Sequence, residues 1–140
     1  MSSSSPSDRP RTIRVLLAKL GLDAHTIGVT VIAKSLRDAG MEVIYSGLKQ
    51  TPEMVVATAI QEDVDVVGIS SLSAAHMNHL PRVIELLKAE GVGDKLIIAG
   101  GVIPKEDGET LKAQGVAEVF TMGTETATIV RYIEDWWATR

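Results

Sequence analysis

The chain contains no cysteine. That absence excludes disulfide bonds, cysteine-ligated iron–sulfur clusters and thiolate zinc sites, and it suits a reducing compartment. No run of basic residues occurs and the net charge is −4, so the composition predicts no binding to nucleic acid. The longest apolar runs have only the length of strands, which predicts no transmembrane helix and no membrane partner. We therefore expect a cytoplasmic protein.

Two glycine-rich nucleotide-binding motifs are also missing. The pair Gly100-Gly101 follows an apolar segment, but no G-K-[ST] comes after it, as a phosphate-binding loop requires. No G-x-G-x-x-G follows the first apolar segment either. The sequence therefore predicts neither a P-loop nor a dinucleotide site.

A length of 140 residues predicts a single domain. Residues 1–12 are rich in Ser, Pro and Arg and lack the apolar stretch of about 7–15 residues that a secretory signal needs. We expect a disordered tail there and one folded domain over residues 13–140, with no internal repeat.

Strand-length apolar runs alternate with helix-length segments along this domain. The expected strands are Ile13–Ala18, Glu42–Tyr45, Asp65–Ile69, Lys95–Ala99 and Ala117–Phe120. The expected helices are Val29–Ala39, Pro52–Glu62, Leu80–Glu90, Glu106–Gln114 and Thr126–Ala138, with Thr51 as an N-cap and Pro81 near a helix start. Strict alternation predicts an α/β fold: a doubly wound, five-stranded parallel sheet of flavodoxin-like (Rossmann-like) type with strand order 2-1-3-4-5.

In that topology a ligand binds over the loops that leave the first and third strands. The first loop holds Asp23 two residues before His25. A carboxylate that bonds one imidazole nitrogen fixes the tautomer and leaves the other nitrogen for a metal. Lys19 would complete a Lys–Asp–His relay, and Gly28 would let a bulky ligand approach. In the alternative interpretation, Asp23 caps a turn and His25 is an ordinary surface residue.

Small polar residues and glycines follow the later strands. Ser70 and Leu72 lie where the third strand ends, and serine hydroxyls there would leave a slot and supply hydrogen-bond donors. The pairs Gly100-Gly101 and Gly123-Thr124 would narrow the wall of that slot so that a flat group fits. Helix caps and ordinary turns explain the serines and glycines equally well.

Trp136 and Trp137 close the last expected helix. Ile129 and Ile133 share helical spacing with one of them, so we expect one indole in the core and the other at the surface.

Taken together, three motifs resemble the cobalamin-binding domain of the methylmalonyl-CoA mutase family. They are D-x-H-x-x-G at residues 23–28, S-x-L at residues 70–72 and the pair at residues 100–101, in that order. The resemblance extends over about residues 13–133. Relatives commonly have D-G-H-D-R-G in the first motif, whereas this chain has Ala24 and Ile27 at the second and fifth positions.

The resemblance implies that cobalamin binds with its own base displaced and His25 as the lower axial ligand of cobalt, supported by Asp23 and Lys19. It further implies that Ser70 meets a nitrogen of the displaced benzimidazole. The other expected cofactor contacts are Gly28, Leu72, Gly100, Gly101, Phe120, Gly123 and Thr124. It places no catalytic residue in this chain.

The resemblance implies the small subunit of a two-component, adenosylcobalamin-dependent acyl-CoA mutase, an isomerase only in complex with a separate large subunit. Such large subunits resemble TIM barrels and bind the acyl-CoA. 2-Hydroxyisobutyryl-CoA and methylmalonyl-CoA are equal candidates for the substrate, ahead of other branched acyl-CoAs.

Two other functions are alternatives. A non-enzymatic cobalamin carrier or light sensor would use the same D-x-H motif, usually behind a four-helix cap. A signalling receiver of the same fold would need an acidic cluster after the first strand and an aspartate after the third, where this chain has Lys19 and Ser70.

Overall fold

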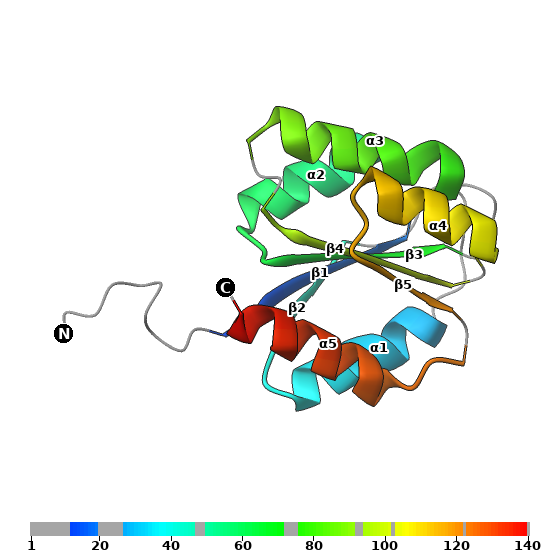
Figure 1. Cartoon of the computed structure of the whole chain (residues 1–140). Coiled ribbons are helices and arrows are strands. Elements are labelled where there is room, and N and C mark those ends of the chain that lie inside the picture. The colour runs from blue at the N-terminus through cyan, green and yellow to red at the C-terminus, as the bar shows by residue number, and fades with distance from the viewer. Residues whose placement is uncertain are drawn as a thin grey trace.

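Five parallel strands form the centre of the molecule. The computed structural model describes residues 12–19, 27–46, 50–71, 76–91, 94–101, 103–121 and 123–139. The strands are β1 (Arg14–Lys19), β2 (Glu42–Tyr45), β3 (Val66–Ser71), β4 (Leu96–Gly101) and β5 (Glu118–Thr121). They pair in parallel in the order β2-β1-β3-β4-β5 (Figure 1), which confirms the predicted doubly wound topology.

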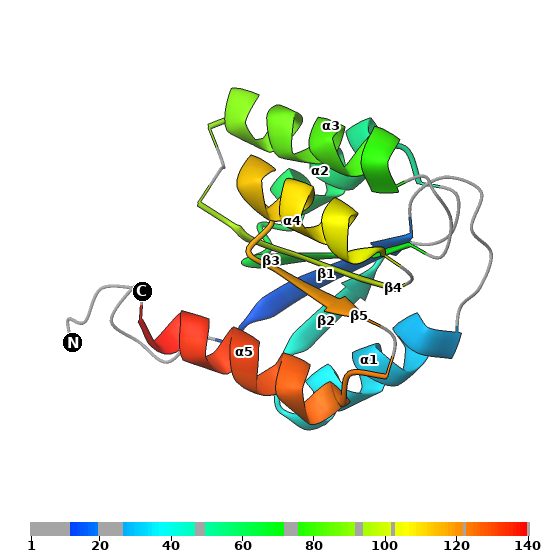
Figure 2. The ribbon, with the colours of Figure 1, turned by 45° about the vertical axis from the view of Figure 1, so that its right-hand side comes forward.

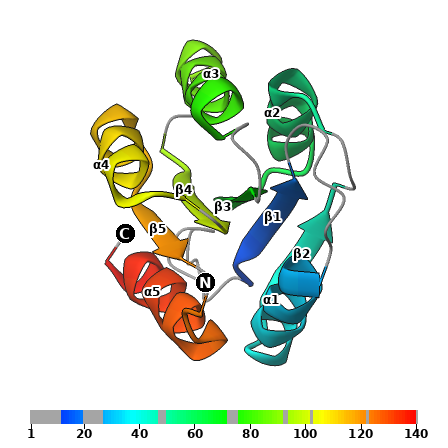
Figure 3. The same ribbon diagram turned by 90° about the vertical axis from the view of Figure 1, so that its right-hand side faces the viewer.

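Helices cover both faces of the sheet. They are α1 (Ile27–Asp38), α2 (Pro52–Gln61), α3 (His76–Ala89), α4 (Lys105–Gln114) and α5 (Thr126–Ala138). Helices α2, α3 and α4 lie on one face, and α1 and α5 lie on the other (Figures 2 and 3). We call these the three-helix face and the two-helix face. Within the described residues, no helix is long and apolar enough to span a bilayer.

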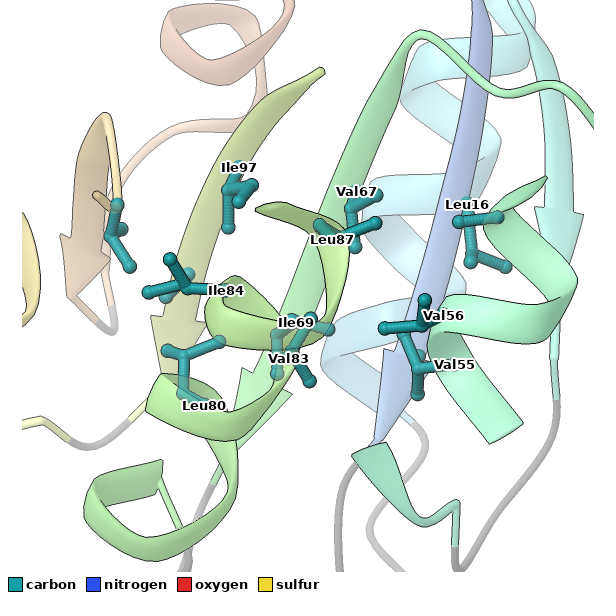
Figure 4. Packing of buried hydrophobic residues seen from close by; sticks show 14 of the residues in the cluster. Leu16, Val55, Val56, Val67, Ile69, Leu80, Val83, Ile84, Leu87 and Ile97 are labelled. Atoms are coloured by element: carbon teal, nitrogen blue, oxygen red, sulfur yellow. The ribbon is translucent and has the colours of Figure 1, made fainter. Parts of the chain in front are cut away.

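Alternation along each strand divides the core between the two faces. In β1, Leu16 and Ala18 pack on the three-helix face, whereas Val15 and Leu17 pack on the two-helix face. Successive side chains of a strand point to opposite faces, so a parallel strand covered on both sides is apolar throughout. Figure 4 shows the larger of these clusters, in which side chains of α2 and α3 meet those of the strands.

Most element boundaries agree with the sequence to within two residues. The predicted cap at Thr51 is confirmed, because its side chain accepts a hydrogen bond from the Met54 N–H at 3.1 Å. The prediction for the third helix was wrong at its start. Helix α3 begins at His76, so Pro81 lies inside it. A proline inside a helix loses one hydrogen bond of the helical ladder and crowds the carbonyl four residues before it, but the buried residues Leu80 and Val83 anchor this part of α3 on the sheet.

The prediction for the tryptophan pair was also wrong, because neither indole is fully buried or fully exposed. Trp136 and Trp137 are both half-buried, and their ring centroids lie 6.1 Å apart. Both pack against the cluster of the two-helix face, beside the buried stripe of Ile129 and Ile133. Neighbouring helical positions differ by about 100°, so two wide side chains can flank one stripe from either side.

Candidate functional site

Four of the expected site residues lie in one line across the carboxyl ends of four strands. Lys19 of β1 is the register partner of Ser70 in β3, and Ser70 is the partner of Gly100 in β4. Gly100 is in turn the partner of Phe120 in β5. We call these four residues the carboxyl-end row. Register partners in parallel strands point to the same face of a sheet, so the row presents one continuous surface.

The carboxyl-end row belongs to the two-helix face. Leu17 and Ile98 precede Lys19 and Gly100 by two residues, and both pack in the cluster beneath α1 and α5. Because side chains alternate along a strand, Lys19 and the position of Gly100 face the same helices.

Exposure changes sharply along this face. In the carboxyl-end row, Ser70, Gly100 and Phe120 are half-buried. One row deeper, Leu17, Gly68 and Ile98 are register partners and all are buried. Over β3 and β4, the two-helix face is therefore accessible at its last row, and the deeper row is the floor beneath it. At the two edges of the sheet the deeper row continues with the exposed Tyr45 and the half-exposed Glu118.

Lys19 differs from the rest of its row because only 1% of it is exposed. A buried ammonium is costly unless it is compensated, and Lys19 does have an interaction partner. Its carbonyl oxygen accepts a hydrogen bond from the Gln50 N–H at 3.1 Å, and Gln50 is itself buried. The structure thus places the buried Lys19 at the end of β1, a few residues before Asp23 and His25 in the sequence.

A side chain at position 100 would crowd the neighbouring strand β5. A Cβ atom built there would lie 3.1 Å from the carbonyl oxygen of Phe120, closer than side chains normally approach backbone. Gly101 follows with a φ of 117°, a backbone conformation that favours glycine. Gly100 therefore leaves the middle of the row without side-chain bulk, and Gly101 lies one residue beyond the row.

The far end of the row is an aromatic contact that the sequence analysis missed. The Phe120 and Tyr132 rings meet edge to face, with centroids 5.5 Å apart and planes at 81°. The Tyr132 hydroxyl donates a hydrogen bond of 3.4 Å to the Ala117 carbonyl. Burial, and then the charge of Glu118, raises the pKa of Tyr132, so the hydroxyl stays a donor. The sequence contained one signal for this contact: Tyr132 directly precedes Ile133, which belongs to the buried stripe of α5.

Gly68, in the floor row, is a second residue that the sequence analysis missed. A Cβ atom there would lie 2.8 Å from Cδ2 of Leu17 and 3.7 Å from Cγ1 of Ile98. An isolated glycine inside an apolar strand is a known signal of close approach, and it was present in the sequence.

The other expected site residues are placed only in part. Gly28 lies in α1, Gly123 follows β5 with a φ of 93°, and Thr124 is half-buried and has an interaction partner. The expected residues Asp23, His25 and Leu72 lie outside the described residues. Among the described residues, no three His, Asp or Glu side chains form a group that could hold a metal ion. A single axial histidine does not need such a group.

Sequence comparisons show which proteins the chain is similar to. Residues 13–131 match the family model of the B12 binding domain. The small subunit of 2-hydroxyisobutanoyl-CoA mutase from Aquincola tertiaricarbonis is 53% identical over 91% of this chain and 94% of its own length. The small subunit of pivalyl-CoA mutase from Xanthobacter autotrophicus is 45% identical over 88% of this chain and 82% of its own length. Methylmalonyl-CoA mutase from Cereibacter sphaeroides is 42% identical over 94% of this chain, which covers 19% of that longer protein.

Structural comparisons show the fold. A cobalamin-binding protein from Desulfitobacterium hafniense has a TM-score of 0.77 and 24% identity, over 90% of this chain and 60% of that one. A response-regulator receiver domain from Mycobacterium tuberculosis has a TM-score of 0.71 and 14% identity, over 94% of this chain and all of that one. Because both kinds of protein share the topology, the fold alone does not distinguish their functions.

Proposed function

This chain belongs to the family of B12-binding domains, and from that premise we propose that it is the cobalamin-binding small subunit of a two-component acyl-CoA mutase. The carboxyl-end row is the observation that carries the proposal. It combines a hydroxyl, a glycine backbone and an aromatic ring in one accessible line, beside the buried side chain of Lys19. That donor set suits a flat heterocycle that carries a ring nitrogen.

The residues of the row fit the displaced nucleotide base of cobalamin. Ser70 supplies a hydroxyl for the base nitrogen, and Gly100 and Gly101 add no side chain that would block a flat ring. The remaining expected contacts would surround the same base: Leu72 on the loop after β3, Phe120, Gly123 and Thr124 at the β5 end, and Gly28 in α1.

His25 is the proposed lower axial ligand of cobalt. Asp23 would hold the other imidazole nitrogen, and the buried side chain of Lys19 would orient the carboxylate of Asp23. These three residues would orient the ligand and tune its basicity; none of them would touch an acyl group. When bound, adenosylcobalamin supplies radical chemistry through its cobalt–carbon bond.

The substrate and its binding site would lie in a partner. Two relatives are named small subunits, and in the longer methylmalonyl-CoA mutase the matching segment is a fifth of one chain. We propose that a separate large subunit, built on a TIM barrel, binds the acyl-CoA and that isomerase activity requires both chains. The cytoplasmic location expected from the sequence stays a prediction.

The absorption spectrum with adenosylcobalamin tests the proposed ligand. The wild-type chain, with its large subunit present, is expected to give the spectrum of a cofactor whose own base is displaced and replaced by histidine. His25→Ala should abolish the histidine-bound signal, because no other group is proposed to reach the lower face. His79→Ala, in helix α3, is the matched control and should leave the spectrum unchanged. An unchanged spectrum in His25→Ala contradicts the assignment.

The substrate is tested by a screen of acyl-CoAs with the reconstituted pair of subunits. The names of the relatives make 2-hydroxyisobutyryl-CoA, pivalyl-CoA and methylmalonyl-CoA the first compounds to compare. Turnover of none of them by a complex that binds the cofactor would favour a cobalamin carrier instead.

A further inference from the structure

A pocket lies at the amino-terminal edge of the sheet, at the opposite end of the strands from the carboxyl-end row. It has a volume of about 270 Å³, and β1 begins there beside the end of α5 (Figure 1). Its lining includes Thr12 and Ile13 before β1, Gly40 after α1, and Glu134 and Trp137 of α5. We propose that this amino-edge pocket is a guanidinium site and that Arg11 of the same chain occupies it. It is separate from the cofactor site of the proposed function.

Helix α5 ends with charges that oppose its own dipole. The carboxyl end of a helix carries a partial negative charge, which basic residues in the last turn offset. The last turn of α5 contains no basic residue, and Glu134 and Asp135 lie at its start. In the described part of the chain, these two side chains form no hydrogen bond or ion pair. Helix α1 ends at the same pocket with Gly40, so the negative end of a second helix lies beside the Glu134 carboxylate and the pocket favours a cation.

Trp137 determines which cation fits best. Glu134 and Trp137 are three residues apart on α5, so their side chains share one face of the helix. The half-buried indole gives the pocket a flat wall beside the carboxylate. A guanidinium is planar, so it can stack on an indole and pair with a carboxylate at the same time. A compact, strongly hydrated ammonium does this less well, and the pair therefore favours arginine over lysine.

The chain itself brings an arginine to this pocket. The backbone at Ile13 already pairs with the sheet, because its carbonyl oxygen accepts a hydrogen bond from the Glu42 N–H at 2.9 Å. The Ile13 side chain packs in the cluster of the two-helix face. Arg11 precedes it by two residues, so in an extended chain its side chain would turn to the same face about 6.6 Å further out. Arg11 lies outside the described residues, but its neighbour Thr12 lines the pocket.

Three other arginines are rival occupants. Arg37 lies in the last turn of α1, and Arg131 precedes Glu134 by three residues on α5. Both are exposed, and neither lines the pocket. Arg9 lies two residues further from the pocket along the chain than Arg11. Because Arg11 is next to a lining residue, its effective concentration at the pocket is the highest of the four.

A double-mutant cycle tests the pairing of Arg11 with Glu134. Urea denaturation of the full chain without cofactor is measured for Arg11→Ala, Glu134→Ala and the double variant. The pair is expected to couple by about two- to fivefold in the equilibrium constant of unfolding. The coupling should decrease as sodium chloride is added, since the pocket is open to solvent. Arg37→Ala with Glu134→Ala is the matched cycle, because it removes the same charge from the neighbouring helix end, and it should show no coupling.

Tryptophan fluorescence tests the contact with the indole. The chain has only two tryptophans, Trp136 and Trp137, so its tryptophan emission reports on this end of α5. Acrylamide is an uncharged quencher and does not respond to the change in charge. Arg11→Ala should raise the quenching of the emission, because Trp137 loses its cover, whereas Arg37→Ala should leave the quenching unchanged.

The proposal requires both results. Coupling of Glu134 to Arg9 or Arg37 in place of Arg11, no coupling at all, or unchanged quenching in Arg11→Ala overturns it. The spectrum of bound adenosylcobalamin should be the same in Arg11→Ala as in wild type, since the two sites lie at opposite edges of the sheet. Failure of the guanidinium site therefore leaves the proposed function intact, and a chain that binds no cobalamin leaves the guanidinium site intact.

Discussion

The two faces of one sheet differ near the carboxyl edge. On the three-helix face, the row before the final residues Ser71, Gly101 and Thr121 is apolar, and its members are register partners packed in or against the larger cluster: Ala18, Ile69, Ala99 and Val119. One residue further along each strand, the two-helix face ends in Lys19, Ser70, Gly100 and Phe120. The first row is apolar and packs in one cluster with side chains of α3. The second row has a hydroxyl, a glycine and an aromatic ring that are half-exposed, beside the buried Lys19.

With the proposed cofactor site on the two-helix face, this difference places residues for stability and residues for binding next to each other along the same strands. Burial of apolar area on the three-helix face supplies free energy of folding, which leaves the other face free to end in residues that contribute little to it. Because the two rows alternate along the same strands, substitutions at adjacent positions should have opposite consequences.

The largest expected effect comes from the closed face. Leu80 of α3 is completely buried, and Leu80→Ala should lower the free energy of unfolding by about 2–5 kcal/mol through lost burial and a cavity. Urea denaturation measures it. Ser70→Ala, on the open face, is the matched comparison: it should change stability by less than about 0.5 kcal/mol and lower cobalamin affinity about fivefold. Equal losses of stability in both variants would remove the distinction between the faces.

A smaller effect is expected where the open row touches its neighbouring strand. Gly100→Val places a Cβ atom 3.1 Å from the Phe120 carbonyl oxygen and adds two methyl groups to the accessible face. Stability should fall by about 1–3 kcal/mol, since backbone cannot move as a side-chain tip does. Cobalamin binding should be lost as well, because the middle of the row is filled. Binding at wild-type affinity in a folded Gly100→Val would show that the row is not the cofactor site.

The smallest expected effect concerns the ion pair between helix α4 and the edge strand β5. Lys112 of α4 lies 2.6 Å from the Glu118 carboxylate of β5, and this hydrogen bond lowers the pKa of Glu118 below its ordinary 4.5. The stabilisation is therefore complete above the ordinary pKa and is lost as the pH falls through the lowered value. Glu118→Gln should be less stable than wild type at neutral pH, and the difference should shrink in acid. If the stability difference between Glu118→Gln and wild type stayed the same from neutral to acid pH, the ion pair with Lys112 would not be its cause.

Much of the fold followed from local patterns. The apolar runs identified all five strands, and Thr51 before Pro52 marked the start of α2 where the structure has it. Local patterns failed where side chains of distant segments decide the outcome. The start of α3 and the half-burial of Trp136 and Trp137 depend on what the helix packs against, which no window of sequence contains.

For the site, the sequence identified residues but not their arrangement. The motifs and their resemblance to cobalamin-binding domains named Lys19, Ser70, Gly100 and Phe120 separately. Gly68 and Tyr132 were passed over, because an isolated strand glycine and a helical tyrosine have common structural explanations. Their importance follows from which side chains lie opposite them across the sheet.

The sequence by itself determined the order of strands and helices and the family, because periodicity, caps and motifs are local properties of the chain. Only the tertiary structure decided that residues of four different strands form one row, that this row faces α1 and α5, and that its floor lies at Gly68. Register and facing depend on hydrogen bonds and packing between segments far apart in the chain, which exist only after the sheet has formed.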